Sequence, residues 1–157
     1  MPATAAFSHH DHAACVTSAL ATAEAECAAR GLQLTPVRRR VLEILLESHV
    51  AIGAYDLLPR LENDGFSAQP PVAYRALTFL IEAGFAHRIE GLNAFVACAR
   101  PGQAHDPAFM ICRTCHRVAE GEAPARLSSG AEAQGFRIEH AVVEAMGLCP
   151  ACLEDAA

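Results

Sequence analysis

Two Cys-x-x-Cys pairs, Cys112/Cys115 and Cys149/Cys152, lie in the last third of this 157-residue chain. Two residues between cysteines let one tight turn bring both sulfur atoms about 2.3 Å from a shared zinc ion, and a second such turn completes a tetrahedron. A single pair is equally typical of a redox motif, whereas two pairs favour a structural zinc site. The stretch from Cys115 to Cys149 is too long for a compact zinc ribbon, so a small domain must fold between the pairs.

The composition predicts a core held together without disulfides. Hydrophobic residues make up 52% of the chain, which is enough to bury a core at this length. Charged residues or Gly interrupt every apolar stretch, so we expect neither a membrane span nor membrane association. The N-terminus lacks the pattern of a secretion signal. Seven cysteines without such a signal predict reduced thiols in a cytoplasmic protein.

The charge balance argues against a protein that coats nucleic acid non-specifically. The chain has 12 Arg, no Lys and 18 acidic residues, and its formal net charge is −6. A protein that coats nucleic acid would be basic. The positive charge is uneven, however, because Arg38, Arg39 and Arg40 form a run. A sequence-specific DNA-binding protein with a local basic surface is therefore still compatible with the negative net charge.

The N-terminal residues 1–14 are small, polar and aperiodic, so we expect a disordered tail. Its string His9-His10-Asp11-His12 has the composition of a metal site. Ordering a free tail around a metal is entropically costly, so loose metal scavenging or no role is the favoured interpretation. The Ala-rich segment 17–30 then predicts a helix that ends at Gly31.

Residues 15–98 read as a winged helix-turn-helix domain. The spacing of apolar residues predicts three further helices and then two strands around a turn. The expected ranges are 36–48, 54–61, 70–83, 85–90 and 93–98. Thr35-Pro36 and Pro70-Pro71 are typical helix starts, and Pro59 is expected to disturb the middle helix. In a winged helix the last helix enters the DNA major groove.

A connector, residues 99–106 (ARPGQAHD), is expected to act as a hinge to a second domain over 107–157. In that domain the pattern predicts a strand around 109–112, a helix within 121–135 and a strand over 136–146. The predicted fold class is α+β: an N-terminal winged helix-turn-helix domain followed by a small α/β domain with the four-cysteine zinc site.

Two sets of side chains are candidates for further binding. On the last helix of the first domain, Tyr74, Arg75 and Thr78 share the face opposite the apolar one. An Arg can donate two hydrogen bonds to guanine, the commonest base-specific contact. Plain core packing is the alternative for any such helix taken alone, and partial burial is the alternative for Tyr74.

The second set consists of His87, Cys98, His105 and Glu120, which flank the hinge. Two imidazoles, one thiolate and one carboxylate suit tetrahedral zinc, and the thiolate disfavours manganese. Taken singly, each has an ordinary interpretation: His87 as a surface histidine, Cys98 as a small buried residue and Glu120 as a solvated charge.

Five segments together resemble the ferric uptake regulator superfamily, and most closely its zinc uptake regulator branch. They are RGLQLTPVRRRVLEIL, AYDLL, PPVAYRALTFLIEAGFAHRIE, CRTCHRV and GLCPAC. The similarity runs from about Ala19 to Leu153. It implies a homodimeric repressor whose C-terminal domain mediates dimerisation and which binds double-stranded operator DNA when loaded with metal, controlling zinc uptake and homeostasis genes.

The resemblance also implies roles for individual residues. The hinge set matches the regulatory zinc ligands of the zinc-sensing branch, so two zinc ions per chain are expected. Tyr55 and Arg75 are implied to approach purine bases, with Arg38, Tyr74 and Thr78 nearer phosphates. No catalytic residue and no small-molecule substrate are implied.

Two alternatives stay open at this level. One is a sensor of iron, nickel or peroxide from the same superfamily, although the segment 107–111 lacks the His-rich string usual in the iron-sensing branch. The other is a thiol oxidoreductase that uses a Cys-x-x-Cys pair, which predicts a βαβ setting and a thiol of low pKa. A zinc deaminase is disfavoured because Pro150 falls inside the second pair instead of before it.

Overall fold

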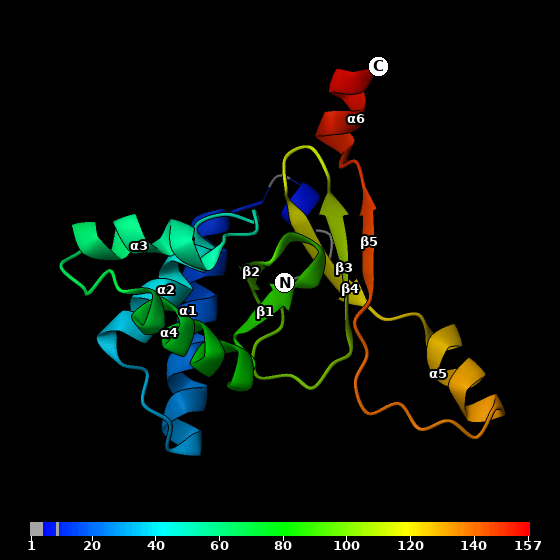
Figure 1. Ribbon diagram of the computed structural model, residues 1–157, viewed down its shortest axis with the longest axis horizontal. Coiled ribbons are helices and arrows are strands. Elements are labelled where there is room, and N and C mark those ends of the chain that lie inside the picture. Colours follow the sequence, from blue (N-terminus) through cyan, green and yellow to red (C-terminus); the bar gives the residue numbers. More distant parts are fainter. Residues whose placement is uncertain (1–4, 9) are drawn as a thin grey trace.

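Helices and a two-stranded hairpin make up the N-terminal half of the computed structural model, which describes residues 5–8 and 10–157 (Figure 1). A 3₁₀ turn, η1 (Ala5–Phe7), precedes them. The helices are α1 (His12–Arg30), α2 (Pro36–Leu46), α3 (Ala54–Asn63) and α4 (Pro70–Glu82). The strands β1 (Ala86–Ile89) and β2 (Ala94–Ala97) pair antiparallel around the turn η2 (Glu90–Leu92). This is the winged-helix arrangement that the sequence predicts.

The helix ends follow the local signals of the sequence. Gly31 ends α1 with a left-handed φ of 65°, and its amide donates to carbonyls of the last turn. Prolines occupy the first turns of α2 and α4, where the missing amide costs no helical hydrogen bond. Pro59 does not end α3, which continues through it to Asn63.

The N-terminal segment is more ordered than expected. Helix α1 begins at His12, because the Asp11 carboxylate accepts the amide of Ala14 at 3.1 Å and caps the first turn. Residues 10–14 therefore belong to a capped helix start and not to an irregular tail. The expectation of a tail also covers residues 1–4 and 9, which lie outside the described residues.

The core of the N-terminal half lies between α2, α3, α4 and the hairpin. Its largest fully buried side chains are Val41, Ile44, Leu45, Leu57, Leu61, Leu77, Leu80 and Phe85. Burying each such side chain contributes about 1.5–3 kcal/mol. This packing fixes α4 so that its polar face points outward. None of the helices within the described ranges has the length and apolar character needed to cross a membrane.

The C-terminal half is a three-stranded sheet with two helices. The strands are β3 (Pro107–Cys112), β4 (Val118–Glu122) and β5 (Glu144–Gly147), in the order β4-β3-β5. β4 pairs antiparallel and β5 parallel to the central β3. The helices α5 (Ala125–Ala133) and α6 (Pro150–Ala156) both project away from the sheet (Figure 1). The predicted α+β class is confirmed.

The strand expected over 136–146 is wrong except for its last residues. β5 begins only at Glu144, which lies opposite Phe109. Val143 falls opposite Ala108, and the residues before it would have to pair at or beyond Pro107, the first residue of β3, which has no amide to donate. The sequence analysis also missed β4, whose residues Glu120 to Glu122 include a glycine and have low strand propensity.

The two halves meet through apolar packing and backbone hydrogen bonds. Ile89 and Val96 of the hairpin pack with three residues of the sheet, Phe109, Ile111 and Val118. The connection between α2 and α3 adds two backbone bonds: Val118 N–H donates to the His49 carbonyl at 2.8 Å, and Ala51 N–H donates to the His116 carbonyl at 3.1 Å.

Candidate metal centres and DNA-facing surface

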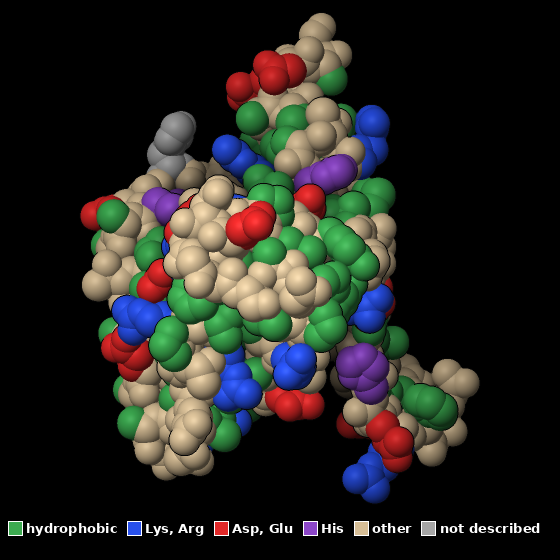
Figure 2. Space-filling model, turned by 60° about the vertical axis from the view of Figure 1, so that its left-hand side comes forward, with side chains coloured by type: hydrophobic (Ala, Val, Ile, Leu, Met, Phe, Trp, Pro, Cys, Tyr) green, Lys and Arg blue, Asp and Glu red, His purple; other side chains and the backbone are tan. Residues whose placement is uncertain are grey.

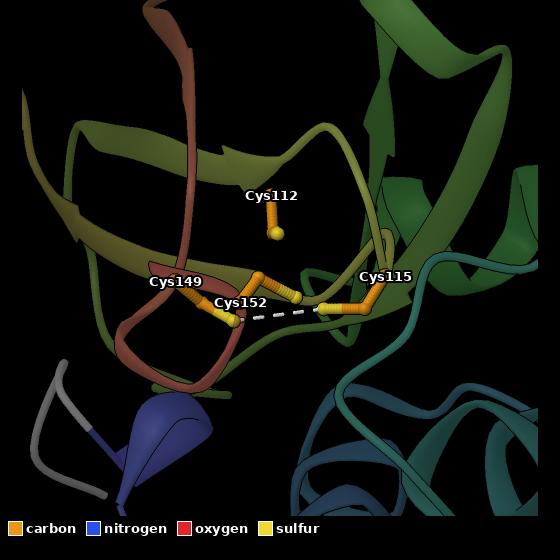
Figure 3. Close-up of side chains that lie close together, drawn as sticks. All are labelled: Cys112, Cys115, Cys149 and Cys152. Carbon is orange, nitrogen blue, oxygen red and sulfur yellow. Dashed lines mark hydrogen bonds between the residues drawn. The ribbon is translucent and has the colours of Figure 1, made fainter. Parts of the chain in front are cut away.

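The four cysteines of the two pairs come together at one end of the sheet. Cys112 ends β3, Cys115 lies in the turn after it, and Cys149 and Cys152 lie at the start of α6. Their sulfur atoms point toward one another (Figure 3) and lie within 4.8 Å of each other. Cys115 Sγ and Cys149 Sγ are 3.7 Å apart. Zinc–sulfur bonds of 2.3 Å in a tetrahedron place sulfurs about 3.8 Å apart, so the cluster matches that geometry.

The backbone of this cluster prepares a thiolate. Amides of Cys115, Cys149 and Thr114 donate to the Cys112 sulfur, and these hydrogen bonds lower the pKa of Cys112 to about 6 despite burial. A hydrogen bond with Cys149, together with burial, raises the pKa of Cys152 to about 12. A low-pKa thiol is also what a redox motif needs. Here, however, Cys112 is 1% exposed, and the second pair of cysteines lies against it, which a redox motif does not need.

A second cluster unites the four residues that flank the hinge. His87 belongs to β1, Cys98 follows β2, His105 lies in the connector and Glu120 belongs to β4. Their ligand atoms lie within 4.8 Å of one another. The set therefore draws on the hairpin, the connector and the C-terminal sheet at once.

The separations in this second cluster resemble the edges of a zinc tetrahedron. His87 Nε2 lies 3.4 Å from Glu120 Oε1, and His105 Nε2 lies 3.6 Å from Cys98 Sγ. Ideal edges are about 3.4 Å between nitrogen and oxygen ligands and about 3.6 Å between sulfur and nitrogen. One edge is shorter: His105 Nε2 and Glu120 Oε1 are 2.6 Å apart, a hydrogen-bond distance.

Glu120 is a buried carboxylate, 7% exposed, and not the solvated charge that is the ordinary interpretation of an isolated Glu. Burial alone would raise its pKa. The His87 ring, whose Nε2 lies 3.4 Å away, and hydrogen bonds with the Ala99 amide at 2.8 Å and with His105 outweigh burial and lower the pKa of Glu120. The site therefore holds an ionised carboxylate in a nearly dry place, where a cation is favoured.

Cys98 has the opposite tendency. Burial, together with the neighbouring Glu120 carboxylate, raises the pKa of Cys98 to about 12, although the Arg100 amide donates to its sulfur at 3.3 Å. The thiol is consequently protonated at neutral pH unless a cation displaces the proton. Once that proton is displaced, a thiolate, a carboxylate and two imidazoles form a donor set that fits zinc.

The outer surface of α4 carries the residues predicted to face DNA. Tyr74, Arg75 and Thr78 are exposed, whereas Ala73 and Leu77 on the same helix are buried, as expected. The Arg75 Nε–H donates to the Pro71 carbonyl at 3.2 Å, which holds the side chain along the first turn of α4.

The two other candidates lie on neighbouring helices. Tyr55, in the first turn of α3, is 65% exposed. Arg38 on α2 is half-buried: its guanidinium carbon lies 3.9 Å from the centre of the Phe79 ring, and Nη1 donates to the Gln33 carbonyl at 2.7 Å. Arg38 is thus partly committed to holding α2 and α4 together.

One contact at this junction was not anticipated from sequence. The Glu144 carboxylate of β5 accepts the amides of Glu90 and Gly91 in the hairpin turn, at 2.5 and 2.8 Å. The Glu144 carboxylate thus joins the C-terminal sheet directly to the turn of the β1–β2 hairpin. No sequence signal marks Glu144, because it is one acid among several between residues 132 and 155.

Comparison with known proteins identifies relatives of this chain. No family model matches the chain. The chain is 44% identical over 140 residues to the zinc uptake regulation protein of Escherichia coli strain K12, covering 86% of this chain and 81% of that protein. A solved structure of a zinc uptake regulator complexed with zinc and DNA is 41% identical, with a TM-score of 0.83, covering 90% of this chain and 98% of that one.

A pair of structures of one relative, XcZur, differs in its likeness to this chain. The holo form gives a TM-score of 0.77 at 38% identity, covering 87% of this chain and 98% of that one. The apo form gives 0.53 at 37%, covering 89% and 99%. The arrangement of the two halves here is thus closer to the holo form. By its identity to the curated relative over most of its length, the chain belongs to the zinc uptake regulator family.

Proposed function

We propose that this protein is a zinc-responsive transcriptional repressor that binds operator DNA as a zinc-loaded homodimer and controls zinc uptake and homeostasis genes. One observation carries the proposal: His87 and Cys98 from the winged helix converge with Glu120 from the C-terminal sheet on a single point. Its partner is DNA, so it acts in the cytoplasm and needs neither a catalytic group nor a small-molecule substrate.

The two clusters have different roles in this proposal, with one zinc ion in each. All four ligands of the cysteine cluster come from the C-terminal half, so metal binding there stabilises one domain. The free energy of binding at such a site is folding free energy, and the zinc is permanent. The cluster of His87, Cys98, His105 and Glu120 is regulatory, because it is complete only when the halves are correctly placed.

The hinge, residues 99–106, links zinc binding at the regulatory cluster to the relative position of the two halves. Moving the winged helix away from the sheet separates His87 and Cys98 from Glu120. Zinc shifts the population only by its difference in affinity between the two shapes, and a nearly complete switch needs about 5.5 kcal/mol. Losing two of four ligands on opening provides a difference of that kind. The closer likeness to holo XcZur supports the idea that this shape is the one favoured by metal.

In the closed shape the exposed surface of α4 is presented to DNA. Arg75 and Tyr55 approach bases in the major groove, and Tyr74, Thr78 and Arg38 contact phosphates. Two copies of α4 in a dimer then sit about 34 Å apart, one turn of DNA. The relative crystallised with zinc and DNA supports this use of the surface.

The homodimer is inferred from the uncovered part of the C-terminal half. β5 is an edge strand of the sheet formed by the described residues, and it carries Met146, which is 57% exposed. Figure 2 shows hydrophobic side chains on the surface of the parts that project from the main body. Exposed apolar side chains along an open sheet edge are typical of an interface.

The test is binding of operator DNA at buffered metal concentrations. A duplex selected from a random pool by the zinc-loaded protein is used in gel shifts with zinc, iron, nickel and manganese. We expect tight binding at the lowest free concentration with zinc, and none after chelation. Tighter response to iron or nickel would assign the protein to a different signal. Binding that ignores metal would contradict the proposed switch.

A further inference from the structure

A third group of metal-ligand side chains lies where the N-terminal segment meets the connection between α2 and α3. His10 precedes α1, His12 is its first residue, and His49 lies in the connection. One nitrogen from each ring lies within 4.8 Å of the others, and all three residues are half-buried. The cluster belongs to neither of the sites described above.

The separations in this triad fit a metal better than hydrogen bonds. His10 Nε2 lies 3.3 Å from His49 Nε2 and 3.4 Å from His12 Nδ1. Hydrogen bonds to nitrogen donors are usually 2.7–3.2 Å long. Zinc–nitrogen bonds of 2.0–2.1 Å in a tetrahedron place the nitrogens about 3.3–3.4 Å apart. Two of the three separations therefore have the length of a tetrahedral edge, and three imidazole ligands leave a fourth position for another ligand.

The surroundings of the rings support the same interpretation. The Nε2 atom of His12 is buried and has no hydrogen-bond partner among the described residues, although buried polar atoms normally have one. The rings stack edge-on or tilted around a common centre, with centroids 5.1–5.5 Å apart. Glu47 and Arg117 line the same hollow, and the Glu47 carboxylate there is already paired with Arg40 and Arg60.

We propose that His10, His12 and His49 form a third metal site that takes Zn²⁺ or another borderline divalent cation with a preference for imidazole. The ion would fasten the start of α1 to the connection between α2 and α3. That connection contacts the C-terminal half, because the His49 carbonyl accepts the Val118 amide and Val118 is two residues from Glu120. The site thus reinforces the junction beside the hinge.

Cobalt absorption separates this site from the other two. Both of those contain thiolates, which give cobalt a charge-transfer band in the near ultraviolet, whereas three imidazoles give only ligand-field bands. The full chain, with its structural zinc retained and weaker metal removed, is titrated with Co²⁺. We expect one equivalent of Co²⁺ to bind at the cluster that contains Cys98 and to show the charge-transfer band. A second equivalent should bind at the three histidines and show ligand-field bands only. The second should disappear in His12→Gln and His49→Gln and persist in His140→Gln, a change at an exposed histidine on the segment 136–143.

Several results would overturn the site. The site is ruled out if every equivalent of Co²⁺ that binds shows the thiolate charge-transfer band. It is also ruled out if the equivalent without that band is lost in His12→Gln but not in His49→Gln, which would show chelation by the N-terminal segment alone. Circular dichroism and the retained thiolate-bound equivalent establish that each variant is folded. Failure of the repressor proposal would be seen separately, as DNA binding without zinc response, and would leave this titration unchanged.

Discussion

The carboxylate of Glu144, on an edge strand of the C-terminal sheet, accepts the amide of Gly91 in the wing turn at 2.8 Å. A second oxygen of the same carboxylate accepts the neighbouring amide of Glu90. This pair of charge-assisted bonds holds the winged helix against the sheet without any metal. It therefore contributes to the same closed shape that brings together the proposed ligands His87, Cys98, His105 and Glu120.

Glu144→Ala should weaken zinc binding at that cluster. Removing the two bonds favours the open shape, so part of the zinc affinity is used to close the hinge. We expect a loss of about threefold to tenfold in zinc affinity, measured by competition with a fluorescent chelator. Glu139→Ala, at an exposed acid outside the junction, is the control. Equal affinity in both variants would show that Glu144 does not bear on closure.

The two metal clusters should respond differently to loss of one ligand. Cys112→Ser removes a ligand of the site that stabilises the C-terminal half, so the protein should unfold or become monomeric. His87→Ala should leave a folded dimer that fails to bind operator at moderate zinc concentrations. Circular dichroism, light scattering and gel shifts measure these outcomes. Equally severe unfolding in both variants would contradict the division of roles.

The fold was predictable where local chemistry decides it. Thr35-Pro36, Pro70-Pro71 and Gly31 mark helix ends, and the structure confirms the helices they delimit. The junction was not predictable in the same way. Glu144 meets the wing turn across more than 50 residues of sequence, and no periodicity or motif announces a carboxylate that pairs with backbone amides.

The candidate metal ligands also differ in how far the sequence alone could identify them. The cysteine pairs were identifiable from spacing alone, because each pair is a local turn. His87, Cys98, His105 and Glu120 were linked by their chemistry and by resemblance, and the structure brings them together. His49 stands apart from the other candidate ligands in the sequence, and the structure places it half-buried against His10. That contact exists only because Asp11 caps α1 and orders the segment before it.

Arg75→Ala should relax sequence preference. Arg75 is exposed on α4 and is the residue proposed to read bases. Loss of a bidentate contact to guanine costs about 1–3 kcal/mol on the preferred operator and much less on altered ones. Fluorescence anisotropy on matched duplexes measures the difference, with Arg126→Ala on α5 as the control for lost charge. A uniform loss across all duplexes would make Arg75 a phosphate contact.

Zinc affinity at the hinge cluster should rise with pH. The Cys98 thiol has its pKa raised to about 12, so at neutral pH it carries a proton that zinc must displace. Lower pH therefore opposes binding, and affinity should increase about tenfold per pH unit above the ordinary imidazole range, from about pH 7.5 to about pH 9. Cys98→Ser should bind more weakly and show a much smaller slope, because serine does not ionise there. A flat profile for the unmodified protein would mean that Cys98 is not a ligand.

We expect the open edge of the C-terminal sheet to form the dimer interface. Met146 on β5 and Met110 on β3 are both exposed, but they point to opposite faces of the sheet, because the parallel register places Met110 opposite Ala145 and Met146 opposite Ile111. A charge at Met146 would be buried without a partner in such an interface, which is strongly unfavourable. Met146→Glu should therefore lower the mass in light scattering toward the 16.6 kDa of one chain and weaken operator binding, since one winged helix loses the added affinity of the second. Ile81→Glu, at an exposed aliphatic residue of α4, should keep the dimer mass. If both variants remain dimeric, the chains associate through another surface.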